Sequence, residues 1–293
     1  MRQAGEQDKA ASQADVVRAS ARAFEHDRYL SALLAPAGVR DDLTALAAFA
    51  GEIARIPGAV SQPMIGDIRL QWWRDTLDAA TEAGEVAAGH PIADALAAAL
   101  RRQKASLDTI HRVLDAQASR LEDRPFRDLD QLVAHLAAYD GGLFEAAWRM
   151  LGGRSTPPAV LAEAGVVYGL ARCLIEAPAE LAQGRVVLPT GLLESHGLPG
   201  HPGADGLAGE ASRAPWRGVQ SDIEAAVEAL LRPLERSYQE ADRLVRIAAL
   251  PIALVRPYLK VSKRGEIVSL QALDAAPLTR VWRIWRTSRT GRL

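Results

Sequence analysis

Two glutamates, Glu176 and Glu180, lie four residues apart in the stretch IEAPAELAQGRVVLP. On a helix, side chains at i and i+4 lie on one face, so paired carboxylates at this spacing can hold a hard cation such as Mg²⁺ through oxygen ligands. Pro178 lies between them. Because proline lacks an N–H and clashes with the preceding turn, we expect the helix to kink or end near Ala177. The two carboxylates should then face solvent rather than a shared cavity.

The elements that position these glutamates are predicted to be helices. Alanine is abundant, aromatic residues make up 5% of the chain, and apolar residues recur at three- and four-residue spacing. Residues 160–175 present one apolar face over about four turns, which is typical of a centrally buried helix. The same periodicity predicts helices over 14–35, 40–56, 64–82, 91–103, 106–121, 128–151, 221–248 and 277–288.

The breaks between these runs contain glycine and proline, but none is a linker between domains. We therefore expect one large helical bundle over residues 14–293, with 1–13 as a disordered N-terminal tail. The longest stretch rich in glycine and proline, 195–215, is expected to be a mobile loop of that bundle.

Composition excludes several classes of function. The formal net charge is -1, from 35 basic and 36 acidic residues, so no nucleic-acid partner is expected. Cys173 is the only cysteine, which excludes an intramolecular disulfide and any cluster of thiolate ligands; its apolar neighbours predict a small buried side chain. No apolar run has the length of a signal peptide or a spanning helix, so we expect a cytoplasmic protein.

Other catalytic patterns are absent from the sequence. The six histidines are scattered without zinc-ligand spacing, and no G-x-S-x-G or phosphate-binding loop occurs. Gly141 and Gly142, within YDGG, are expected to allow close helix packing or a local break.

Seven stretches follow one another along the chain in an order that is itself informative. They are EHDRYLSALLAP (25–36), LTALAAFAGEIARI (43–56), IRLQWWRDTL (68–77), YDGGLFEAAWRMLG (139–152), GRVVLPTGLLESHG (184–197), LPIALVRPYL (250–259) and PLTRVWRIWR (277–286). This ordered set resembles the squalene/phytoene synthase superfamily over nearly the whole chain. The resemblance implies an all-α isoprenoid synthase (trans-prenyltransferase) fold with a central cavity.

The chain departs from the two aspartate-rich motifs of the catalytic members. Where the first motif belongs, AFAGEIARIPGAV has Glu52 as its only acid. Glu176 and Glu180 fall on the two aspartate positions of the second motif, and no two aspartates in the chain lie four apart. The metal cage that the family uses to neutralise a leaving diphosphate is therefore expected to be incomplete.

In lacking these motifs the chain resembles the non-catalytic branch of the superfamily. The stretches QWWRD (71–75) and LPTGLLESHG (188–197), together with Pro178, resemble that branch too. That branch includes a mitochondrial assembly factor for respiratory complex I and its bacterial relatives. The resemblance implies an assembly or chaperone-like factor without a cofactor, whose partner is a respiratory-complex subunit or assembly intermediate. Function inferred in this way rests on analogy rather than on a site.

Two alternatives stay open. The first is an active head-to-head prenyltransferase that condenses prenyl diphosphates with Mg²⁺ held by Glu176 and Glu180. The second is a non-catalytic protein that binds an isoprenoid or another lipid in the former substrate cavity. The candidate cavity-lining residues are Glu52, Gln71, Arg74, Tyr139, Tyr168 and Arg185.

Two tryptophans in IRLQWWRDTL lie on different faces of the predicted helix. Trp72 shares a face with Ile68, whereas Trp73 shares one with Leu70 and Leu77. We expect a helix buried on both sides, because large aromatic side chains usually belong to the core; the alternative is an aromatic cage for a ligand.

The C-terminal stretch RVWRIWRTSRTGRL combines basic and aromatic residues. Arginine recurs every third residue from Arg280 to Arg289, beside Trp282 and Trp285. We expect the tryptophans to dock the last helix on the core while the arginines face water. The alternative is an amphipathic helix that lies on an anionic membrane surface and makes the protein peripheral at the inner membrane.

Overall fold

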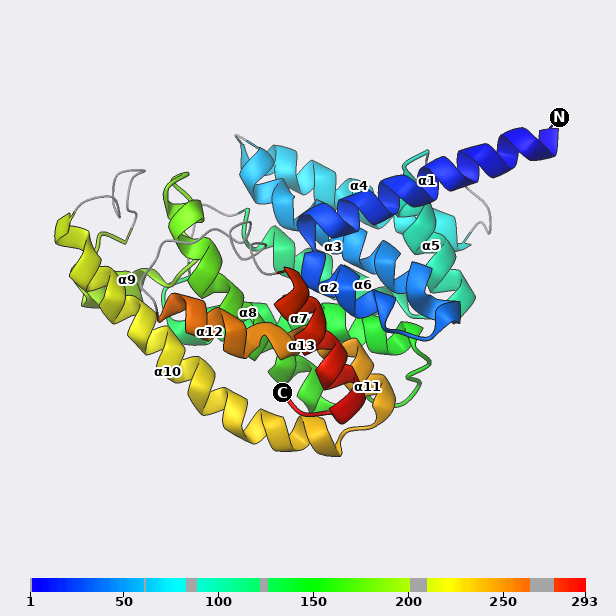
Figure 1. Ribbon diagram of the computed structural model, residues 1–293. Helices are drawn as coiled ribbons and strands as arrows, with labels where there is room; N and C mark the ends of the chain where they lie inside the picture. Colours follow the sequence, from blue (N-terminus) through cyan, green and yellow to red (C-terminus); the bar gives the residue numbers. More distant parts are fainter. Residues whose placement is uncertain (1, 61, 83–88, 122–125, 201–209, 264–276) are drawn as a thin grey trace. The chain divides into compact units, whose positions relative to one another are not determined.

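The computed structural model describes residues 2–60, 62–82, 89–121, 126–200, 210–263 and 277–293 (Figure 1). Within these ranges every regular element is an α-helix or a short 3-10 helix, and no strand occurs. The all-α prediction is confirmed. No helix in the described ranges is long and apolar enough to cross a membrane.

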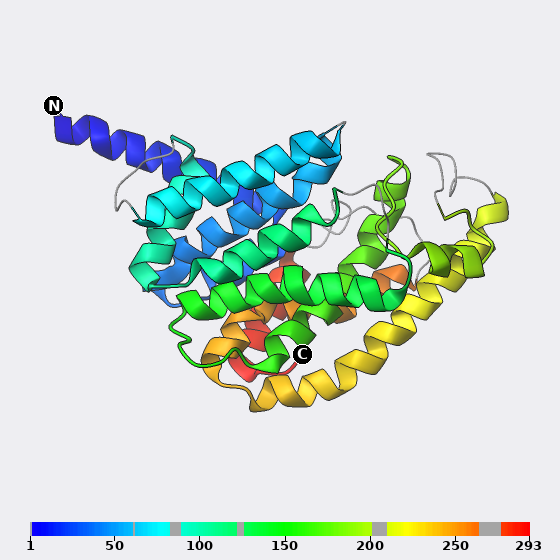
Figure 2. The same cartoon turned by 180° about the vertical axis from the view of Figure 1, so that it is seen from behind.

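The helices group into two compact units. Unit 1 comprises residues 1–121 and 142–157, and unit 2 comprises 122–141 and 158–293. The single helical domain expected from the sequence stays a prediction, and the boundary between the two units passes through the interior of helix α7 (Leu129–Met150). Figure 2 shows α7 as one unbroken helix. A boundary inside a helix has no linker composition that a sequence pattern could reveal.

Unit 1 is organised around α3 (Arg40–Ala59), which packs against its neighbours on several sides. Residues 42–51 are all buried, and alanine at four of these ten positions and glycine at a fifth let adjacent helices approach closely. The other helices of the unit are α1 (Arg2–Phe24), α2 (His26–Leu33), η1 (Ala37–Val39), α4 (Pro63–Glu82), α5 (Pro91–Gln103) and α6 (Leu107–Ala118), followed by the C-terminal part of α7.

Unit 2 is organised around α8 (Ala159–Leu181), which packs against α10 (Glu210–Glu240), α11 (Arg243–Ala248), η2 (Leu250–Leu254) and α12 (Val255–Ser262). The remaining helices of this unit are α9 (Thr190–Ser195) and α13 (Pro277–Thr290), together with the N-terminal part of α7. The apolar periodicity predicted for residues 160–175 accounts for the buried positions of α8.

Helices α7 and α8 of unit 2 approach each other closely through their backbones. A Cβ atom added at Gly165 would lie 2.1 Å from the backbone nitrogen of Gly141, and one added at Gly141 would lie 2.9 Å from the Cα atom of Ala162. Only hydrogen fits at either position. The expectation that Gly141 permits close helix packing is confirmed, and its alternative, a local break, does not occur, since α7 continues to Met150.

Some boundaries differ from those predicted. Helix α1 begins at Arg2, so residues 2–13 are helical rather than a disordered tail; alanine, glutamine, glutamate and lysine in this stretch are good helix formers. Of the loop expected at 195–215, residues 201–209 lie outside the described residues, while Ser195 ends α9 and 210–215 belong to α10. Helix α12 was not predicted because its apolar pattern spans only eight residues.

Replacement of Gly165 by alanine tests the contact between α7 and α8. The added methyl group would meet backbone rather than a flexible side chain, so we expect the free energy of unfolding to fall by about 3 kcal/mol. Gly38→Ala is the matched control, because a Cβ there meets nothing within 4 Å. Urea denaturation followed by circular dichroism measures both variants. Equal midpoints for the two would contradict the close contact.

Candidate functional site

Helix α8 continues past Pro178 and ends at Leu181. Of the two outcomes predicted near Ala177, a kink or an end, the end is therefore wrong. Pro178 lies in the last turn, where its missing N–H costs a single hydrogen bond, and burial of Ala177, Pro178 and Leu181 holds the turn in place. Because the helix is continuous, Glu176 and Glu180 lie on the same face rather than on different ones.

Each of the two glutamates is paired with an arginine of its own segment. Glu176 Oε1 accepts hydrogen bonds from Arg172 Nε at 2.9 Å and from Arg172 Nη2 at 2.7 Å. Glu180 is bidentate with Arg185, at 2.7 Å to Nε and 2.9 Å to Nη2. The two glutamate side chains are 29% and 28% exposed, so neither is fully turned to solvent nor enclosed.

The turn after α8 brings Arg185 back to Glu180. Gly184 has φ 76°, in the left-handed region that glycine adopts without strain. Its N–H donates to the carbonyl of Leu181, and the N–H of Arg185 donates to the carbonyl of Glu180 at 2.9 Å. The hydrogen bond from the Arg185 guanidinium to the Glu180 carboxylate raises the pKa of Arg185, whereas burial lowers it. The Gly-Arg turn therefore builds the ion pair.

Glu52, the acid expected where the family's first motif belongs, is also paired with a nearby arginine. Its Oε1 accepts a hydrogen bond from Arg55 Nη2 at 2.6 Å and one from the Ser20 hydroxyl at 3.2 Å. The Arg55 guanidinium carbon lies 3.6 Å from the centre of the Phe24 ring, which fixes the arginine beside its partner.

These residues do not fit a magnesium site. Mg²⁺ needs several oxygen ligands at near-octahedral geometry, and here each carboxylate already faces a guanidinium that a cation would have to displace. Within the described ranges, no group of three or more histidine, cysteine, aspartate or glutamate side chains is arranged to hold a metal ion.

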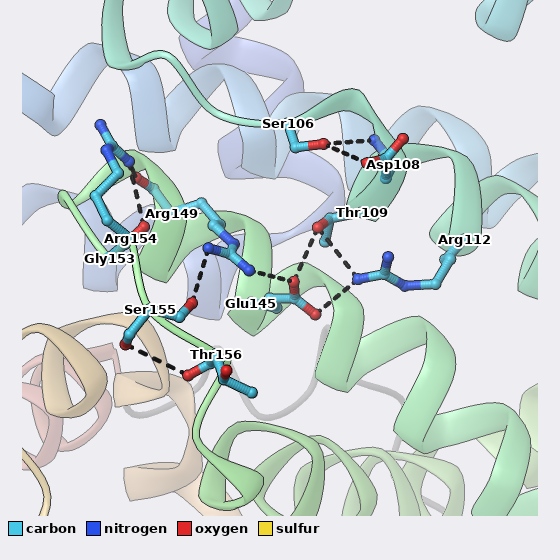
Figure 3. A network of polar contacts seen from close by, with 10 residues as sticks. All are labelled: Ser106, Asp108, Thr109, Arg112, Glu145, Arg149, Gly153, Arg154, Ser155 and Thr156. Atoms are coloured by element: carbon cyan, nitrogen blue, oxygen red, sulfur yellow. Dashed lines mark hydrogen bonds and ion pairs between the residues drawn. The ribbon is translucent and has the colours of Figure 1, made fainter.

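Glu145 shows the same pairing of an acid with arginines elsewhere in unit 1 (Figure 3). It accepts hydrogen bonds from Thr109 Oγ1 at 3.0 Å and from Arg112 Nη2 at 2.8 Å, and Arg149 lies 3.5 Å away. The contacts join α6 to the C-terminal part of α7. This carboxylate is structural and is not available as a ligand.

The other predicted cavity residues are divided between the two units. Tyr168 is fully buried in unit 2 beneath the guanidinium of Arg172, and Tyr139 is also buried there. In unit 1, Gln71 donates to Asp75 at 2.7 Å, and Arg74 pairs with Asp115.

Cys173 is only partly buried, so the prediction of a buried cysteine is wrong. The periodicity of α8 places it at the edge of the apolar face rather than inside it.

A pocket of 410 Å³ lies in unit 1 between α3 and α4. Its lining residues are Glu52, Arg55, Ile56 and Ala59 of α3, Ile68, Arg69, Trp72 and Trp73 of α4, and His90. Among the six residues predicted to line a cavity, only Glu52 belongs to this pocket. Arg69 and His90 were missed because neither has a motif; the paired tryptophans were the one signal in the sequence.

The prediction that α4 is buried on both sides is wrong. Trp73 is buried and meets the Phe49 ring edge-on, with ring centres 5.2 Å apart. The opposite face is exposed: Trp72 is 40% exposed and Ile68 is 61% exposed, and Met64 and Ile65 lie on the same side. Periodicity tells which residues share a face, but not whether another element covers it.

For the C-terminal helix, the expectation that the tryptophans dock on the core is wrong, whereas Arg286 and Arg289 face water as expected. Trp282 and Trp285 of α13 are 52% and 46% exposed, while Arg280 and Ile284 are buried. The face of α13 that packs on the rest of unit 2 therefore contains Arg280, whereas Trp282 and Trp285 are on the exposed face.

The sequence profile of the squalene/phytoene synthase family matches residues 21–281. The chain belongs to this family. Its structural neighbours in the family include the squalene synthase HpnC from Alicyclobacillus acidocaldarius, at TM-score 0.68 and 16% identity over 89% of this chain and 97% of that one. A dehydrosqualene synthase solved with a ligand matches at TM-score 0.70 and 12% identity, over 96% and 97% of the two chains. The fold is therefore the isoprenoid synthase fold.

Curated relatives with a different role are also similar to the chain. NADH dehydrogenase (ubiquinone) complex I, assembly factor 6, from Bos taurus is 28% identical over 178 residues, which is 60% of this chain and 53% of the relative. The protein of the same name from Homo sapiens is 25% identical over the same shares. The match spans about half the length of these relatives.

Addition of Mg²⁺ tests the pairing of the glutamates. A ligand that binds only the folded state raises the melting temperature, so a working metal site would make the protein more heat-stable in millimolar Mg²⁺. We expect no such increase in the wild type or in a Glu176→Gln, Glu180→Gln double variant, measured by differential scanning calorimetry. A rise in the wild type that the double variant lacks would contradict the account.

Proposed function

We propose that this chain is a non-catalytic member of its family that assists the assembly of respiratory complex I. The observation that carries the proposal is that Glu52, Glu176 and Glu180, the acids expected from the sequence at the positions of the family's metal ligands, are each paired with an arginine. Loss of a diphosphate leaving group needs cations at that position, and these carboxylates are already neutralised. The similarity to complex I assembly factor 6 of Bos taurus and Homo sapiens supports the assembly role.

An assembly factor needs a surface that binds other proteins, and the exposed face of α4 suits this role. Met64, Ile65, Ile68 and Trp72 form an apolar stripe at helical spacing. Arg69 lies beside the stripe and lines the pocket with Trp72. Tryptophan and arginine next to a hollow are the residues that most often dominate the binding energy of protein interfaces. We propose that a complex I subunit or an assembly intermediate binds here.

A second candidate function is binding of an isoprenoid or another lipid, and the pocket favours it. Its volume of 410 Å³ is within the range of small-molecule sites, and its walls combine apolar side chains with Arg55 and Arg69. Native mass spectrometry of the purified protein separates this candidate from the first, because a retained lipid would appear as added mass. The central cavity and the prenyltransferase activity considered from the sequence stay predictions.

Complementation of cells that lack this chain tests the assembly role. We expect deletion to lower NADH:ubiquinone oxidoreductase activity several-fold, and both the wild type and Glu176→Gln, Glu180→Gln to restore it. Ile68→Asp with Trp72→Asp should fail, because buried charge is not tolerated in an apolar interface.

The matched control is Leu230→Asp, which places the same charge at an apolar residue of α10 that is also 40% exposed. It should restore activity. Full recovery with the α4 double variant would contradict the proposed surface, whereas unchanged complex I activity after deletion would contradict the assembly role itself.

A further inference from the structure

The exposed side of α13 carries an apolar stripe that no described part of the chain covers. Leu278 is 83% exposed, and Val281, Trp282 and Trp285 are each about half exposed. These residues follow the spacing i, i+3, i+4 and i+7, so they lie on one face of the helix. Large apolar side chains gathered on one exposed face mark a surface that binds something.

The opposite face of α13 packs against other helices of unit 2. Ile284 is fully buried, and the buried Arg280 donates to the hydroxyl of Tyr258 in α12 at 3.3 Å. At the C-terminal end, the buried Thr287 accepts the N–H of Gly291 at its carbonyl and donates its hydroxyl to the Arg292 carbonyl at 2.9 Å. In the described structure, α13 packs on η2 (Figure 1). These contacts hold the stripe outward.

The charged side chains around the apolar stripe are all positive. Residues 277–293 contain five arginines and no acidic residue. Arg286, Arg289 and Arg292 are exposed, and Arg283 is partly exposed. None of these four is ion-paired within the described structure. The guanidinium of Arg286 lies 5.6 Å from the centre of the Trp282 ring, so positive charge borders the apolar stripe directly.

We propose that α13 binds the surface of a membrane rich in anionic phospholipid, lying parallel to it with the apolar stripe among the headgroups. Tryptophan and leucine on one face with arginines beside them are the composition of interfacial helices. The arginines supply the second, electrostatic contribution that a short helix needs. A second copy of the chain is a poorer partner, because a symmetric contact through this face would bring arginines against arginines.

This inference goes beyond the assembly role and does not depend on it. Its consequence is that the protein is held at the membrane reversibly, by a helix whose other face belongs to the fold. Because exposed charges are screened by ions, the binding weakens as salt increases.

Vesicle flotation with the full purified chain tests the proposal. One set of vesicles contains phosphatidylcholine alone and the other phosphatidylcholine with phosphatidylglycerol. We expect at least tenfold tighter binding to the anionic vesicles at low salt. Trp282→Ser with Trp285→Ser, and separately Arg286→Glu with Arg289→Glu, should each weaken that binding at least tenfold.

Two controls isolate the surface. Arg232→Glu with Arg236→Glu changes the net charge equally at exposed positions of α10, and Leu230→Ser removes an exposed large apolar side chain from the same helix. Both should bind as the wild type does, and circular dichroism should show all variants folded. Equal binding to the two vesicle types would overturn the proposal. The proposal would also be overturned if Trp282→Ser with Trp285→Ser kept vesicle binding but lost self-association, measured by size-exclusion chromatography.

Discussion

The backbone contact between α7 and α8 is the constraint on which unit 2 depends. Gly165 and Gly141 approach so closely that a Cβ atom on Gly165 would fall 2.1 Å from a backbone nitrogen. This contact fixes α8 in the centre, where α10, α12 and η2 pack against it. The C-terminal turn of α8, which carries the two glutamates, therefore starts from a rigid helix. That rigidity lets Gly184 direct Arg185 back onto Glu180 and close the ion pair.

The local chemistry of the sequence accounts for much of the fold. The prediction of a helix over 91–103 matches α5, because Pro91 suits a first helical position and the left-handed Lys104 ends the helix. The family resemblance supplied the isoprenoid synthase fold, which periodicity alone could not distinguish from other helical bundles. Pro178 was misjudged because the proline rule describes a helix interior, whereas the residue lies in a buried last turn.

The faces of helices were harder to predict than the helices themselves. Trp72 and Trp282 were both expected in the core, yet each is on an exposed face. Whether an apolar face is covered depends on elements distant in sequence. The residue pattern of a single helix does not show which elements pack against it. The pocket in unit 1 was missed for the same reason, because its lining residues come from α3, α4 and His90, which are distant in sequence.

The acids expected to hold cations in the family fold are here paired with arginines, and we propose that the chain keeps the scaffold and binds its partners through exposed helix faces. The most direct test of this account incubates the purified protein with farnesyl diphosphate and Mg²⁺ and looks for head-to-head condensation products by mass spectrometry. The account predicts none above a heat-denatured control. A longer isoprenoid formed by the wild type, and absent with Glu176→Gln, Glu180→Gln, would contradict it.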